Sequence, residues 1–270
     1  MRHQPHPGAP AMPFADAAHL SDLNGYLGTG INQVKGWCIP HLWQAIWPVV
    51  RMVGAGPVAE IGVFEGKFLI GLIKSFDPDA KYSHAAIDVY DLQQFNLDGA
   101  GVGKAAVLDA NLAAQGLSRH RVEKLRADSM TLRAADAADL IARHDKFKFF
   151  SVDGCHEVTH TLCDIEFAMS VTAPEGLIAV DDYLNPNWPG VNEAVAKMYL
   201  MHNYPFVPLC YSMNKLFLCS VSWHEIYLAA ILKGVKEHHP DTAVKEVRRF
   251  GFRTLTVIPK LAGWQPLRGG

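Results

Sequence analysis

Carboxylates and one histidine follow two neighbouring apolar runs of the sequence. One run ends in Asp153, with His156 three residues later, and a second run ends in Asp181 and Asp182. Ligands of open α/β sheets bind at the carboxyl ends of the strands. Three carboxylates gathered there repel one another unless a cation lies among them. These residues therefore predict a metal-assisted enzyme.

The residue types at this position also indicate which metal and which chemistry to expect. Three carboxylates without a cysteine pair favour Mg²⁺ or another hard divalent cation over Zn²⁺. Such a cation can hold a substrate hydroxyl and lower its pKa, and His156 could take the hydroxyl proton, because imidazole titrates near neutral pH. The alternative is structural: His156 would cap or pack a helix, and Asp181 and Asp182 would be solvated acids at a strand end.

A second set of residues predicts a nucleoside-type cofactor. Gly62 and Gly66 follow the first strand and allow a tight turn close to a ligand. Asp88 ends the second strand, where an acid can accept both hydroxyls of a ribose. Asp128 follows the third strand and is placed to meet the edge of a base. Each residue alone could merely cap a helix, but acids at successive strand ends, Glu60 among them, favour an adenosine-type cofactor.

S-adenosylmethionine fits this set better than NAD. The dinucleotide fingerprint requires G-x-G-x-x-G, because a pyrophosphate approaches the helix N-terminus, and the sequence lacks that triplet. Glu60 lies just before the turn, where an acid disfavours a pyrophosphate and favours an ammonium. An NAD-dependent dehydrogenase is the rival enzyme. A non-catalytic cofactor-binding protein is the other alternative, although such a protein need not keep a costly cluster of like charges.

Short apolar runs alternate with helical patterns through the middle of the chain. The expected strands lie at 58–62, 84–88 and 121–126, before Asp153, before Asp181, and at 206–211 and 216–221. The expected helices lie at 68–76, 104–115, 131–142, 158–171 and 192–202. This alternation predicts an α/β fold with a doubly wound, mostly parallel, seven-stranded sheet.

The remaining segments define the expected domain organisation. Residues 1–14 are rich in His, Pro, Gly and Ala and predict a mobile tail. Residues 15–56 predict a helical N-terminal extension, and residues 57–221 the cofactor-binding domain. Residues 222–270 predict a C-terminal appendage with a helix at 223–236 and a strand at 253–258.

Composition restricts the partners. The 270 residues carry a formal net charge of -2 with no basic stripe, so we expect no nucleic acid. The sequence contains no apolar run of about 18 residues, so we expect no membrane span. Five scattered cysteines without a C-x-x-C pair favour a reduced, cytoplasmic protein. The expected partner is a small hydroxylated molecule. No segment predicts a decisive subunit interface, so a homo-oligomer is an open alternative.

Four motifs resemble a known family. Residues 60–67 (Glu-Ile-Gly-Val-Phe-Glu-Gly-Lys), Ile87-Asp88, residues 152–156 and residues 180–183 resemble the class I S-adenosylmethionine-dependent methyltransferases. More narrowly, they resemble metal-dependent small-molecule O-methyltransferases of the macrocin/mycinamicin and cephalosporin-biosynthesis type. Residues 34–37 are similar to that family's lead-in segment. The resemblance covers roughly residues 30–220 of the chain.

The resemblance implies a Rossmann-like methyltransferase fold and a role for each matching residue. Methyl transfer would go from S-adenosylmethionine to a hydroxyl of a natural-product or sugar-like substrate. The implied contacts are Glu60, Gly62 and Gly66 to the methionine moiety, Asp88 to the ribose, and Asp128 with Ser129 to the adenine. Asp153, Asp181 and Asp182 would hold Mg²⁺, and His156 would act as the base.

A competing motif overlaps these residues. His156-Glu157-Val-Thr-His160 matches the H-E-x-x-H signature of zinc proteases. That chemistry needs both imidazoles one helical turn apart in mid-helix. Here the match opens directly from a strand end, so we expect Glu157 and His160 to be exposed helix residues.

Overall fold

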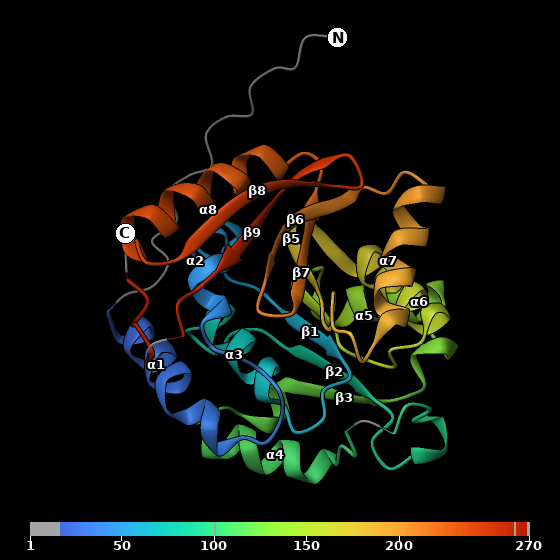
Figure 1. Cartoon of the computed structure of the whole chain (residues 1–270). Helices are drawn as coiled ribbons and strands as arrows, with labels where there is room; N and C mark the ends of the chain where they lie inside the picture. Colours follow the sequence, from blue (N-terminus) through green and yellow to red (C-terminus); the bar gives the residue numbers. More distant parts are fainter. Residues whose placement is uncertain (1–16, 100, 262, 269–270) are drawn as a thin grey trace.

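A computed structural model describes residues 17–99, 101–261 and 263–268, and the predicted tail at 1–14 lies outside them. The described residues form one nine-stranded sheet in the order β3-β2-β1-β4-β5-β7-β6-β9-β8 (Figure 1). The strands are β1 (Val58–Ile61), β2 (His84–Asp88), β3 (Val122–Arg126), β4 (Phe147–Val152), β5 (Thr172–Val180), β6 (Phe206–Ser212), β7 (Lys215–Ser220), β8 (Ala243–Arg249) and β9 (Phe252–Ile258).

Helices cover both faces of the sheet. They are α1 (Ala17–Gly28), α2 (Leu42–Val53), α3 (Lys67–Phe76), α4 (Ala105–Ala114), α5 (Ala134–His144), α6 (Val158–Val171), α7 (Pro189–Met201) and α8 (His224–His238). One core lies between the sheet and α1–α4 with α8, and the other lies between the sheet and α5–α7 (Figure 1). The two cores confirm the doubly wound α/β fold.

The first five strands run parallel, and their order reverses beside β1. β1 pairs with β2 on one side and with β4 on the other, both in parallel register. A reversal of this kind leaves a crevice at the carboxyl ends of the two central strands, where ligands of such sheets bind. β1, β2 and β4 are short and almost wholly buried, as expected for apolar runs covered on both faces.

The sheet is wider than the seven strands expected. β9 pairs with β6 in parallel, and β8 closes the edge antiparallel to β9. The C-terminal segment therefore extends the central sheet instead of standing apart from it. Its helix α8 packs on α2, and a Cβ at Gly234 would overlap the ring of Pro48. The predicted helix and strand of this segment are confirmed, but β8 was missed because Lys245, Glu246, Arg248 and Arg249 interrupt its apolar pattern.

Two further expectations concern membrane spans and the cysteines. No helix among the described residues is long and apolar enough to cross a membrane. All five cysteines are described, and each is a free thiol.

Candidate active site

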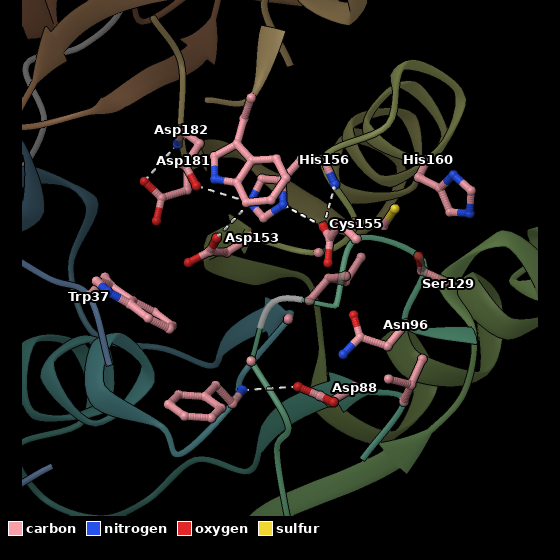
Figure 2. A pocket seen from close by; sticks show the side chains of 18 of the residues that line it. Trp37, Asp88, Asn96, Ser129, Asp153, Cys155, His156, His160, Asp181 and Asp182 are labelled. Atoms are coloured by element: carbon pink, nitrogen blue, oxygen red, sulfur yellow. Dashed lines mark hydrogen bonds and ion pairs between the residues drawn. The ribbon is translucent and has the colours of Figure 1, made fainter. Parts of the chain in front are cut away.

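A cavity of about 720 Å³ opens at the carboxyl ends of the central strands (Figure 2). Its size is that of pockets that enclose a cofactor and a small substrate. Eight of the residues predicted from the sequence line it: Gly62, Asp88, Asp128, Ser129, Asp153, His156, Asp181 and Asp182. Glu60 and Gly66 are not among its lining residues.

The two acids at the ends of β2 and β3 line one side of this cavity and also hold its loops. Asp88 accepts the backbone N–H of Phe64 at 2.9 Å and that of Tyr90 at 2.7 Å. Burial raises the pKa of Asp88, and these hydrogen bonds oppose the rise. Asp128 accepts the N–H of Met130 at 3.0 Å and caps a short 3₁₀ turn. Each carboxylate keeps further lone pairs that a ligand hydroxyl or amine could use.

The turn after β1 is built by close backbone approach. Gly62 has φ +79°, and a Cβ there would overlap the carbonyl oxygen of Asp153 at the end of β4. Gly66 has φ +87° and precedes α3, where a Cβ would overlap the side chain of Leu108. Only glycine combines this backbone conformation with so little space. The two glycines therefore allow β1, β4 and α4 to meet beside the cavity.

Glu60 does not lie where the sequence placed it. Its side chain is 2% exposed and lies outside the cavity lining. Burial raises the pKa of Glu60 to about 8, while the nearby Lys215 opposes the rise. Glu60 is therefore not among the side chains that the cavity presents to a ligand.

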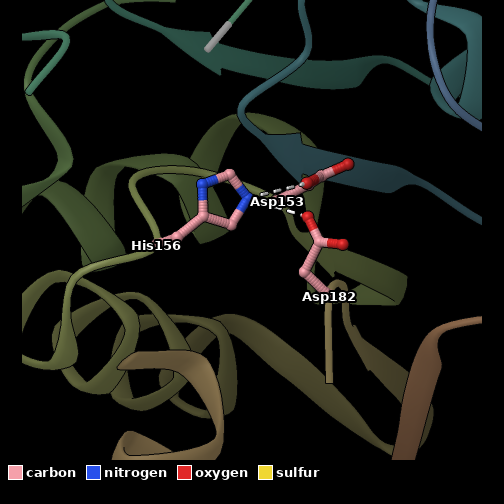
Figure 3. A group of neighbouring side chains, drawn as sticks. All are labelled: Asp153, His156 and Asp182. Atoms are coloured by element: carbon pink, nitrogen blue, oxygen red, sulfur yellow. Dashed lines mark ion pairs between the residues drawn. The ribbon is translucent and has the colours of Figure 1, made fainter. Parts of the chain in front are cut away.

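At the other side of the cavity, Asp153, His156 and Asp182 form a group of candidate metal ligands (Figure 3). One ligand atom from each lies within 4.8 Å of the others. His156 Nε2 is 2.9 Å from Asp182 Oδ2 and 4.0 Å from Asp153 Oδ1. The ends of β4 and β5 therefore bring two of the predicted carboxylates and the histidine together.

The third predicted carboxylate, Asp181, has a different partner. Its side chain forms an ion pair with Lys215, the first residue of β7, and both side chains are buried. Lys215 Nζ is also 3.9 Å from Asp153 Oδ2 and lies 4.4 Å from the ring centroid of Phe68. Asp181 is thus paired with an ammonium that also lies close to Asp153. Sequence reasoning missed Lys215, although its place directly after a hairpin turn was visible.

Two contacts fix the orientation of His156. Its Nδ1 lies 2.6 Å from Asp98 Oδ2, and its ring stacks on Trp188 with centroids 4.2 Å apart. Burial lowers the pKa of His156, but the carboxylates of Asp182 and Asp98 outweigh it and raise that pKa to about 9. His156 can act as a base or a ligand only when Nε2 carries no proton.

Asp182 is held by amides as well as by the histidine. Its Oδ1 accepts the side-chain N–H groups of Asn185 and Asn214, each at 2.6 Å. Burial raises the pKa of Asp182, but His156 and these amides outweigh it and lower that pKa to about 2. Asp182 itself has φ +54°, an uncommon backbone conformation that these bonds stabilise.

The zinc-protease motif is not assembled. α6 begins at Val158, so His156 precedes the helix and His160 lies in its first turn. His160 lines the cavity, but it does not belong to the group formed by Asp153, His156 and Asp182 (Figure 2). The two imidazoles therefore do not share a metal site in mid-helix.

The cavity wall also carries large rings and amides. Trp37, which is 76% exposed, stacks on Phe64 with centroids 5.7 Å apart. Asn185, Asn187 and Trp188 line the cavity, whereas Tyr183 packs in the core against Tyr211. Three residues of the segment after Asp182 thus contribute to the cavity wall.

Comparisons with known proteins agree with this fold. Residues 59–183 match the family model described as a methyltransferase domain. The structure of the O-methyltransferase NovP superposes with a TM-score of 0.55 at 12% identity, covering 76% of this chain and 98% of NovP. The structure of CalS11, described as a TDP-rhamnose 3'-O-methyltransferase of calicheamicin biosynthesis, has a TM-score of 0.49 at 19% identity, covering 75% and 93%. No curated protein sequence matched the chain.

The matched segment runs from the second residue of β1 to the residues just after β5 and includes all three residues of the candidate metal group. Residues 59–183 are thus similar to a methyltransferase domain, and the fold of the described residues is that of the O-methyltransferase NovP.

Proposed function

We propose that this protein is a methyltransferase that moves the methyl group of S-adenosylmethionine to a hydroxyl of a small natural-product or sugar-like molecule, with a divalent cation holding that hydroxyl. The observation that supports it most is the cavity itself. The strand-end acids Asp88 and Asp128 line the same cavity as the group of Asp153, His156 and Asp182. One cavity thus offers an adenosyl site and a cation site together.

The donors of the candidate cation site suit a hard divalent ion. Asp153 and Asp182 supply carboxylate oxygens. His156 Nε2 is buried and makes no well-directed hydrogen bond, although Asp182 Oδ2 is 2.9 Å away. Two acids and one imidazole fit Mg²⁺ or Mn²⁺. When bound, such a cation polarises a hydroxyl oxygen, lowers its pKa and fixes its direction of attack.

The chain's own residues position the reactants. Asp88 and Asp128 hold the loops around the adenosyl side, and Trp188 with Asn185 and Asn187 walls the substrate side. The substrate oxygen bonds to the methyl carbon as the carbon–sulfur bond breaks, which leaves S-adenosylhomocysteine and a proton. We assign His156 to the cation through Nε2, because that atom faces the two carboxylates. The base role predicted from the sequence is the alternative for the same nitrogen.

Calorimetry with S-adenosylhomocysteine and with NAD tests the cofactor. We expect S-adenosylhomocysteine to bind and NAD not to bind. Tight NAD binding without affinity for S-adenosylhomocysteine would instead assign a dehydrogenase. Transfer of labelled methyl from S-adenosylmethionine to a panel of hydroxylated compounds then tests the reaction. Binding without transfer to any acceptor, with Mg²⁺ or Mn²⁺ present, would favour a non-catalytic cofactor-binding protein.

A further inference from the structure

Asp98 reaches the candidate cation site from a distant part of the sequence. It lies in the segment between β2 and α4, 58 residues before His156. Its carboxylate oxygen Oδ2 meets the ring Nδ1 of His156 at 2.6 Å and accepts the backbone N–H of the same residue at 3.2 Å. The Asp98 side chain is only 6% exposed. One buried oxygen therefore holds both the ring and the backbone of His156.

This contact determines which ring nitrogen carries the permanent proton. A carboxylate only accepts hydrogen bonds, so Nδ1 must donate to Asp98. Nε2 is then the nitrogen whose proton can be given up, and it points to Asp153 and Asp182. Trp188 stacks on the ring face, so rotation of the imidazole is blocked from a second direction.

We propose that Asp98 is a positioning residue: it orients the His156 ring and keeps a proton on Nδ1, so that Nε2 is presented to Asp153 and Asp182. A histidine that ligates a metal commonly donates its other ring N–H to a carboxylate, which fixes the tautomer and raises ligand basicity. In this role Asp98 acts through His156. The presence of a bound ion in this inference rests on the proposed function. The assignment of the proton to Nδ1 does not depend on it.

The test uses three variants of the full chain. Asp98→Ala removes both contacts, and Asp98→Asn keeps an oxygen acceptor without the charge. Asp91→Asn is the matched control, because Asp91 lies on the same segment, is 68% exposed and pairs with Arg126. Long-range ¹H–¹⁵N spectra of the metal-free protein report the protonation of His156 Nδ1, and calorimetry with Mn²⁺ reports the affinity of the site. Circular dichroism confirms that each variant is folded.

We expect a hydrogen-bonded Nδ1–H signal in the wild type and in Asp91→Asn, and its loss in Asp98→Ala. The Mn²⁺ affinity should fall roughly 10–100-fold in Asp98→Ala, less in Asp98→Asn, and not in Asp91→Asn. Unchanged Nδ1 signal in Asp98→Ala, or Mn²⁺ affinity equal to that of Asp91→Asn, would overturn the proposal. If the wild type binds no Mn²⁺, the ion of the proposed function is refuted, and the Nδ1 signal alone decides whether Asp98 orients the ring.

Discussion

Lys215 and Asp181 form a buried ion pair beneath the candidate cation site. Lys215 is 2% exposed and Asp181 is 8% exposed. Burial lowers the pKa of Lys215, but Asp181 and Asp153 outweigh it and raise that pKa. The ammonium thus offsets part of the negative charge that Asp153, Asp181 and Asp182 would otherwise concentrate. The ammonium of Lys215 is one cation that the chain itself supplies. Asp153, Asp182 and His156 are then the residues that face a bound metal cation.

We predict that Lys215→Met destabilises the protein by about 3–5 kcal/mol, because it leaves Asp181 buried without its partner. The double variant Lys215→Met/Asp181→Asn should recover much of this loss, since the uncompensated charge is gone. The free energy of unfolding in urea, measured for both single variants and the double variant, gives the coupling between the two residues. Simple additivity of the two single effects would show that the pair is not coupled.

We predict that Gly62→Ala destabilises the protein by about 2–3 kcal/mol or more, because φ is +79° and the new Cβ would meet the Asp153 carbonyl. The matched control is Gly25→Ala in α1, where no atom lies within 4 Å of an added Cβ. That variant should be neutral or gain about 0.5–1 kcal/mol from helix propensity. Urea denaturation measures both, and equal stability of the two variants would refute the close approach of β1 to β4.

Several site residues could be predicted from the sequence because they end strands. Asp88, Asp153 and Asp182 follow apolar runs, and the sheet brings such ends to one edge. Asp98 and Lys215 could not be predicted in the same way. Their contacts depend on the path of an irregular segment and on the register of a hairpin, and neither leaves a periodic pattern. The pairing of Asp181 with Lys215 could not be predicted for the same reason, since Lys215 comes from β7.

Far from the cavity, His84 should make stability depend on pH. Its Nδ1 accepts the N–H of Val58 at 3.2 Å, and its Nε2 lies 3.2 Å from Asp77 Oδ2. A neutral ring with the proton on Nε2 satisfies both contacts, whereas a second proton would face the Val58 N–H. Burial lowers the pKa of His84 from 6.5, although Asp77 opposes this. The folded state therefore excludes a proton that the unfolded chain binds.

The stabilising effect of neutral His84 is complete above pH 6.5 and decreases as the pH falls below that value. The decrease is at most about 1.4 kcal/mol per pH unit. We predict that His84→Asn, which keeps an acceptor for Val58, has a smaller loss of stability between pH 6.5 and 4.5. The pKa of Asp77 is lowered from 3.8, so its own contribution changes only below this window. His120→Asn at an exposed position is the control. Identical pH slopes in the wild type and His84→Asn would contradict the assignment.

We predict that Asp182→Asn abolishes methyl transfer while S-adenosylhomocysteine still binds, because Asp182 belongs to the cation group at the far side of the cavity from Asp88. Calorimetry and a labelled-methyl assay measure the two properties separately. The control is Asp136→Asn, an exposed acid in the first turn of α5, which should keep both properties. Wild-type transfer rates in Asp182→Asn would refute a role for this carboxylate.

The central claim is tested most directly by anomalous diffraction from crystals soaked with Mn²⁺ and S-adenosylhomocysteine. We predict one strong manganese peak among Asp153, His156 Nε2 and the Asp182 carboxylate, with the cofactor in the same cavity and Asp181 still paired with Lys215. A cavity that holds the cofactor but shows no peak there, or a peak coordinated by Asp181 after Lys215 has moved away, would contradict the account.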